Sequence, residues 1–112
     1  MVINVFEQYL SAKAKVNGVE RRAVLVMLIS DSEAGQIRYT AAASFFPHRD
    51  EEDYAVSYDA YAEKVLFEGK GRRSKKREAK LLETFPEAID ELAAGIGGKV
   101  FWDKPLREAR RG

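Results

Sequence analysis

The sequence contains no cysteine and only one histidine among its 112 residues. The absence of cysteine excludes disulfide bonds, thiol catalysis and cysteine-ligated zinc, although it fixes no cellular compartment. A single histidine cannot complete a transition-metal shell, and no nucleophile-elbow motif surrounds any serine. We therefore expect no cofactor and no bound metal, and a binding function in preference to an enzymatic one.

Long apolar runs are also absent. The longest, Ala23 to Ile29, spans seven residues, whereas a helix needs about 20 to cross a bilayer. The N-terminus has no basic region ahead of an apolar one, so it does not resemble a secretory signal. Apolar residues make up 46% and charged residues 33%, as in ordinary globular proteins. We expect a soluble cytoplasmic protein with no membrane partner, folded as one domain over residues 1–112, with 103–112 as a frayed tail.

The first half of the chain has the pattern of an antiparallel sheet. Residues 6–16 alternate between apolar and polar side chains, and Asn17-Gly18 then gives a strong signal for a two-residue hairpin turn. A second strand at 21–30 is apolar on both faces and needs cover on each. A third strand at 36–46 should end at Pro47, which cannot donate to a ladder. For the first hairpin the predicted cross-strand pairs are Lys15 with Glu20, Leu10 with Leu25, and Phe6 with Ile29.

The segment 51–66 is ambiguous. The pattern favours a helix with Tyr54, Tyr58 and Tyr61 on one stripe, most simply as core. In that arrangement a pocket lined by the tyrosines and His48 could lie over the alanines at 41–43. The alternative is one strand around 54–58 and another at 64–68. If the segment is strand, a partner subunit is the expected cover for the second strand, and the protein is a homodimer.

The C-terminal part is predicted to be helical over 74–96. Ser74 is the expected N-cap, and Thr84 with Glu87 resembles a second capping box around Pro86. One apolar stripe crosses Pro86, so we expect either two helices meeting at a kink or a single bent helix. Glycines at 95–98 end the helix, and 99–102 form a short strand or docking segment. The predicted fold is α+β, an antiparallel β-meander of three to five strands with this helical segment packed on one face.

Charge is segregated along the chain. Residues 1–69 carry a balance of −4, residues 70–80 a balance of +6 and residues 81–112 a balance of −1. Basic side chains at a helix start oppose the helix dipole, at a cost of a few tenths of a kcal/mol each. A cluster this dense can contact several phosphates at once. The candidate polyanion-binding residues are Lys70, Arg72, Arg73, Ser74, Lys75, Lys76, Arg77 and Lys80.

Two functions are compatible with these features. The first is a small binding module that engages nucleic acid, or an acidic protein surface, through residues 70–80. It requires the basic side chains to be exposed on one surface, and acid-paired guanidinium groups would argue against it. The second is a self-associating structural or accessory protein, in which the acidic part of one chain meets the basic segment of another.

Overall fold

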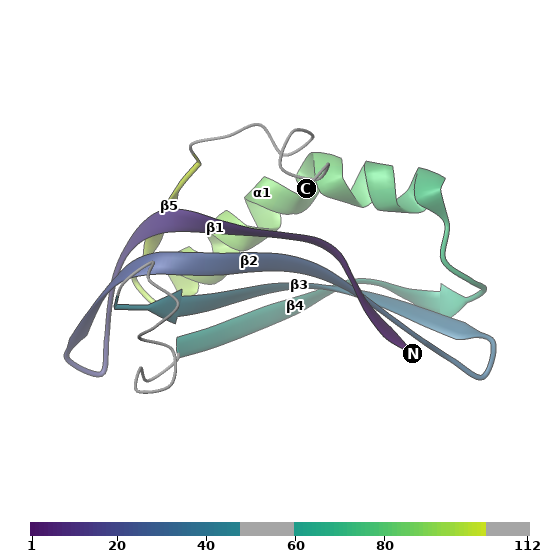
Figure 1. The fold of residues 1–112 in the computed structure, drawn as a ribbon, viewed down its shortest axis with the longest axis horizontal. Coiled ribbons are helices and arrows are strands. Elements are labelled where there is room, and N and C mark those ends of the chain that lie inside the picture. Colours follow the sequence, from purple (N-terminus) through teal and green to yellow (C-terminus); the bar gives the residue numbers. More distant parts are fainter. Residues whose placement is uncertain (48–59, 103–112) are drawn as a thin grey trace.

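The computed structural model describes residues 1–47 and 60–102, and Figure 1 shows its two layers, a curled sheet and one helix. The sheet has five antiparallel strands in the order β4-β3-β2-β1-β5, so the first four form a meander. This confirms the predicted α+β class and the C-terminal helix packed on one face. The elements are β1 (Val2–Val16), β2 (Val19–Glu33), β3 (Gln36–Phe46), β4 (Ala60–Lys70), α1 (Lys75–Gly95) and β5 (Lys99–Phe101).

The β1–β2 hairpin turns at Asn17 and Gly18, which both have positive φ as a type I′ turn requires. The predicted pair of Lys15 with Glu20 is confirmed. The other two predicted pairs are wrong by one residue, because the register shifts between Ser11 and Ala14. An extra residue in β1 at that bulge displaces all earlier pairs. The observed pairs are Leu10 with Val24 and Phe6 with Leu28.

The favoured helix over 51–66 is wrong where the structure describes the segment, since Ala60–Lys70 is strand β4. Residues 48–59 lie outside the described residues. β4 pairs antiparallel with β3, opposite Gln36 at one end and Phe45 at the other. This pairing satisfies backbone groups along the outer side of β3, which a helix at these positions would leave without partners. A local periodicity in the sequence carries no information about this long-range pairing of β4 with β3.

α1 is a single continuous helix of 21 residues that includes Pro86. The second capping box is therefore wrong, and the Thr84 hydroxyl instead donates to the Leu81 carbonyl at 3.3 Å, within the helix. The predicted end is confirmed: Gly97 has a φ of 73°, and its N–H donates to the Ala94 carbonyl at 3.0 Å. The following segment forms the short strand β5, whose central residue Val100 is buried.

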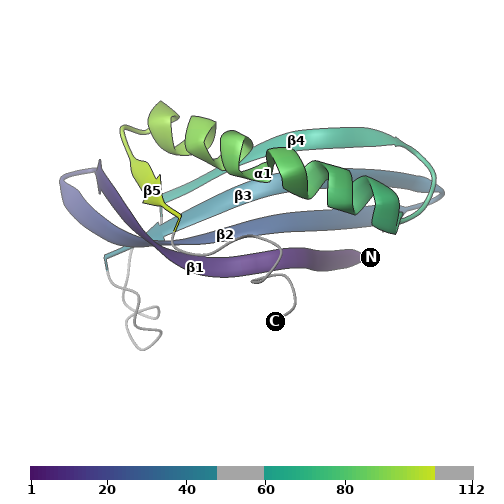
Figure 2. The same ribbon diagram turned by 90° about the horizontal axis from the view of Figure 1, so that it is seen from above.

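The hydrophobic core lies between the sheet and the apolar stripe of α1. Phe85 is fully buried and meets Phe6 of β1 edge to face, with ring centroids 5.5 Å apart. Trp102 closes one end, where its indole N–H donates to Asp90 at 3.0 Å. The helix lies across one face of the sheet, as Figure 1 and Figure 2 show together. On the other face Leu25, Met27 and Ile29 of β2 are half-buried.

Candidate polyanion interface

The basic segment connects the edge strand β4 to α1. Ser74 is the N-cap: its backbone is extended, and its hydroxyl oxygen accepts from the Arg77 N–H at 3.3 Å, as the sequence predicted. Gly71 has a φ of 131° and its N–H donates to the Gly35 carbonyl at 2.9 Å. That bond ties the segment to the β2–β3 turn. The basic residues therefore have a fixed place at one end of the molecule (Figure 1).

Arg73 is engaged by a buried carboxylate. Its guanidinium donates to both oxygens of Glu78, at 3.0 and 3.2 Å, and Glu78 is only 2% exposed. The Tyr39 hydroxyl also donates to Glu78, at 2.8 Å, and accepts from the Ser74 N–H at 3.3 Å. Burial and the hydrogen bond to Glu78 raise the pKa of Tyr39. The hydrogen bond from Arg73 to Glu78 raises the pKa of the guanidinium above its ordinary value. Arg73 thus fastens the helix start to the sheet through Glu78 and Tyr39. Its acid pairing argues against Arg73 as a member of the polyanion-binding group.

Arg77 also has an intramolecular contact. Its guanidinium carbon lies 3.7 Å from the centroid of the Phe67 ring on β4, a cation–π geometry. Phe67 in turn packs against Tyr39, with ring centroids 6.4 Å apart. Arg77 is therefore directed toward the sheet and away from the outer face of the helix.

The five remaining cations are exposed and have no ion pair within residues 1–47 and 60–102. Some exposed cations elsewhere are paired, as Arg38 is with Glu68 at 2.7 Å and Lys64 with Glu91 at 3.0 Å, whereas Lys13, Lys15 and Lys99 have no ion pair among the described residues. The basic segment therefore carries a concentration of positive charge that the described part of the chain does not neutralise. These five are Lys70, Arg72, Lys75, Lys76 and Lys80.

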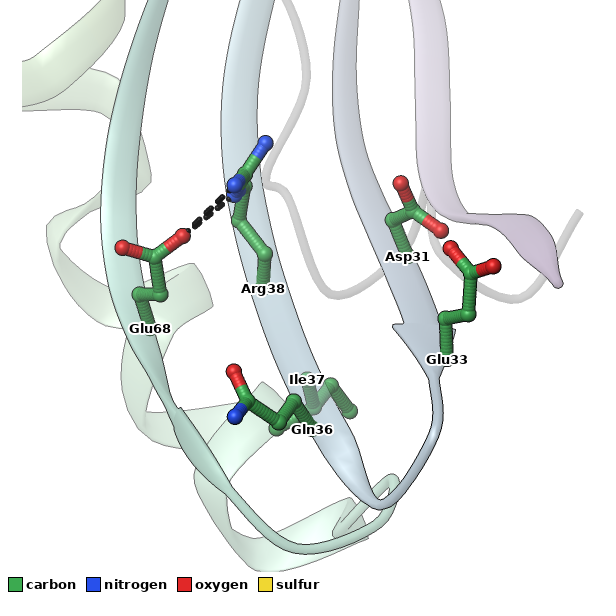
Figure 3. A pocket seen from close by; sticks show the side chains of 6 residues that line it. All are labelled: Asp31, Glu33, Gln36, Ile37, Arg38 and Glu68. Atoms are coloured by element: carbon green, nitrogen blue, oxygen red, sulfur yellow. Dashed lines mark hydrogen bonds and ion pairs between the residues drawn. The ribbon is translucent and has the colours of Figure 1, made fainter.

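Two cavities lie beside the β2–β3 turn; Glu33 and Gln36 line both, and the other charged residues that line them differ. One, of about 370 Å³, is lined by the turn residues 32–36 together with Gly71, Arg72 and Arg73. The other, of about 260 Å³, is lined mainly by acidic and polar side chains. Figure 3 shows Arg38 and Glu68 in the second cavity, joined by their ion pair, with Asp31 and Glu33 across from them. The positive surface at the helix start thus borders a negative one on β2 and β4.

Of the four residues of the pocket that the sequence suggested around the tyrosines, only Tyr61 is among the described residues. His48, Tyr54 and Tyr58 lie outside the described residues. Tyr61 lies on strand β4, half exposed, so it cannot belong to a helical stripe. Its hydroxyl donates to Glu63 at 2.8 Å, and burial together with this bond raises its pKa to about 12.

The structure also brings together three lysines that the sequence analysis did not group. Lys13, Lys15 and Lys99 line a cavity of about 410 Å³ at the end of the molecule where α1 finishes. Lys13 lies directly opposite Lys99 in the β1–β5 pair. No local pattern could have found this cluster, because β5 must first pair with β1.

Among the described residues, no group of three or more histidine, cysteine or acidic side chains could hold a metal ion. No helix in this part of the chain is long and apolar enough to span a membrane. Comparisons with protein-family models, curated proteins and solved structures find no match to the chain.

Proposed function

We propose that the protein is a small binding module that engages nucleic acid through the exposed cations of residues 70–80. The observation that carries the proposal is the group of five cations around the start of α1 that have no ion pair with any described residue. Phosphates are the ligands that such a group neutralises, with release of counterions from the nucleic acid. The contact is to the phosphate backbone and is therefore independent of base sequence.

The local arrangement supports this function in a second way. Two of the cations, Lys76 and Lys80, are one helical turn apart, and like charges at this spacing destabilise a helix. Lys76 also lies in the first turn of α1, where the helix dipole disfavours positive charge. Both costs are recovered when a phosphate backbone lies over the helix start. Arg73 and Arg77 have a different role, since their contacts with Glu78 and Phe67 position the segment.

The test is fluorescence anisotropy with a labelled duplex oligonucleotide, titrated at several salt concentrations. With up to five phosphates neutralised, we expect a log–log salt slope of magnitude about 3 to 5. Replacing Lys76 and Lys80 together by alanine should lower that magnitude by about 2. Both side chains are exposed, so the fold should be preserved. An absence of binding even at low salt would exclude this function.

The matched control is the Lys13→Ala/Lys15→Ala double variant, which removes the same charge from exposed positions at the other end of the molecule. If both double variants weaken binding equally, the attraction is a property of net charge and the basic segment is not a site. If only Lys76→Ala/Lys80→Ala does so, the segment is the contact. An acidic protein surface remains the other partner class for the same cations. Self-association, with the acidic part of one chain meeting the basic segment of another, is the alternative function.

A further inference from the structure

The two edges of the sheet differ in how they are covered. On the outer side of β1, strand β5 pairs only with Ser11, Ala12 and Lys13. Within the described residues, Val2 to Leu10 therefore have a strand on one side only, an open edge about 30 Å long. In Figure 2 this part of β1 forms the margin of the sheet opposite β4. Backbone groups along such an edge are a template for another strand.

The β4 edge is protected against pairing with a further strand, whereas the β1 edge is largely unprotected. β4 carries the charged side chains Glu63, Lys64, Glu68 and Lys70, and its register shifts near Leu66. Charges and bulges of this kind are what proteins place on edges that must remain unpaired. From Val2 to Leu10 the one charged side chain is Glu7, and Val2 is 65% exposed. A register shift at Val5 leaves the stretch from Phe6 to Leu10 regular.

Gln8 lies at the centre of that regular stretch. Its side-chain oxygen is buried and has no hydrogen-bond partner among the described residues. Buried polar atoms in folded proteins are normally satisfied, so an unsatisfied one calls for an explanation. An antiparallel strand added at this edge would place a new side chain directly opposite Gln8, with Cβ atoms about 5 Å apart.

We propose that a second copy of the chain pairs with this edge, β1 antiparallel to β1, with the two-fold axis passing at Gln8. The two Gln8 amides then lie opposite each other, and Phe6 lies opposite Leu10 of the other copy. Glu7 lies opposite Tyr9, whereas a register centred one residue earlier would set the two Glu7 carboxylates against each other. The contact is isologous and closes at a dimer, in which both sheets join into one. This inference does not rest on nucleic-acid binding.

The open face of β2 is a less suitable surface for a second copy. Its apolar residues Leu25, Met27 and Ile29 are already half-buried within the chain. In the row of cross-strand neighbours that includes Met27, the outermost residues are Glu7 on β1 and Glu63 on β4. Two such faces stacked together would bring like charges toward each other at both margins.

The experiment uses charged replacements at the axis. Gln8→Glu and Gln8→Lys each place two like charges directly opposite each other, so each should weaken the dimer by about tenfold or more in sedimentation equilibrium. An equimolar mixture of the two variants should recover a dimer, because the opposed charges are then of opposite sign. The control Gln36→Glu makes the same change at an exposed position at the start of β3 and should leave the dimer unchanged.

A wild-type chain that stays monomeric up to millimolar concentration would overturn the proposal. So would a dimer that Gln8→Glu and Gln8→Lys leave intact, or a mixture of the two that fails to recover. A dimer weakened by Val65→Lys, on the open face of β4, and not by the Gln8 variants would move the contact to that face. If a Gln8 variant does not fold, hydrogen exchange of the wild type still decides the question. In a dimer the amides between Phe6 and Leu10 that point away from β2 gain protection as concentration rises, and in a monomer they do not.

Discussion

The Tyr39 hydroxyl donates a 2.8 Å hydrogen bond to the carboxylate of Glu78, and both groups are almost completely buried. Tyr39 comes from the first part of β3 and Glu78 from the first turn of α1. Arg73 supplies the positive charge that a buried carboxylate needs. This cluster fixes the orientation of the helix start, and with it the place of the exposed cations.

Removing the hydroxyl should destabilise the fold. Tyr39→Phe deletes the donor to Glu78 and the acceptor of the Ser74 N–H. We expect a loss of about 1–3 kcal/mol in the free energy of unfolding, measured by urea denaturation. Tyr61→Phe is the matched control, since that hydroxyl bonds Glu63 on an exposed strand. Its effect should stay within about 0.5 kcal/mol. Equal losses in the two variants would contradict a special role for the buried cluster.

Stability should fall at alkaline pH, in part through Tyr39. Burial and the Glu78 hydrogen bond raise the pKa of Tyr39 in the folded protein above its ordinary value of 10.0. Below that value the hydroxyl is protonated in both the folded and unfolded states, and its full contribution is present. As pH rises through the folded-state pKa, the contribution is lost. The stability difference between wild type and Tyr39→Phe should therefore narrow above about pH 10, and a constant difference would argue against the raised pKa.

Gly98 should tolerate no side chain. A Cβ there would lie 2.9 Å from the Ala14 Cβ and 3.3 Å from the Lys13 carbonyl oxygen. Since backbone cannot move aside cheaply, Gly98→Ala should cost about 1–3 kcal/mol and loosen β5 from β1. Gly95→Ala, at the end of α1 with nothing within 4 Å, is the control and should stabilise by about 0.5–1 kcal/mol. Thermal denaturation followed by Trp102 fluorescence would measure the stability of both variants. A neutral Gly98→Ala would mean that β5 is held loosely.

The contact between Phe6 and Phe85 should show coupling beyond simple burial. The rings meet edge to face at 5.5 Å, and both side chains are buried. In a double-mutant cycle with Phe6→Leu and Phe85→Leu, we expect a coupling free energy of about 0.5–1.5 kcal/mol. If the two losses in the free energy of unfolding, measured by urea denaturation, are strictly additive, the contact contributes only through its buried apolar area.

Local signals in the sequence located much of the fold. Asn17-Gly18 specified the first turn, because few residue pairs accept positive φ at both positions. Ser74 marked the helix start, and the third strand ended before Pro47 as expected. In the candidate site, the basic residues can be read from the sequence, and the sequence predicted that they gather at a helix start. Each of these features depends on residues that are neighbours in the chain.

The tertiary structure decided what depends on distant partners. Ala60–Lys70 became a strand because β3 offered it pairing partners from one end to the other, although the pattern of 51–66 favoured a helix. The register of β1 was set by bulges, which no alternation of side chains reveals. Arg77 differs from the other cations because packing places its guanidinium over Phe67 of β4, whereas the Glu78 that pairs with Arg73 is only five residues away in the chain. The sequence by itself determined the position of the positive charge along the chain. Only the folded sheet and helix determined which of those charges are neutralised within the molecule, because ion pairing and stacking require side chains that lie close together in space.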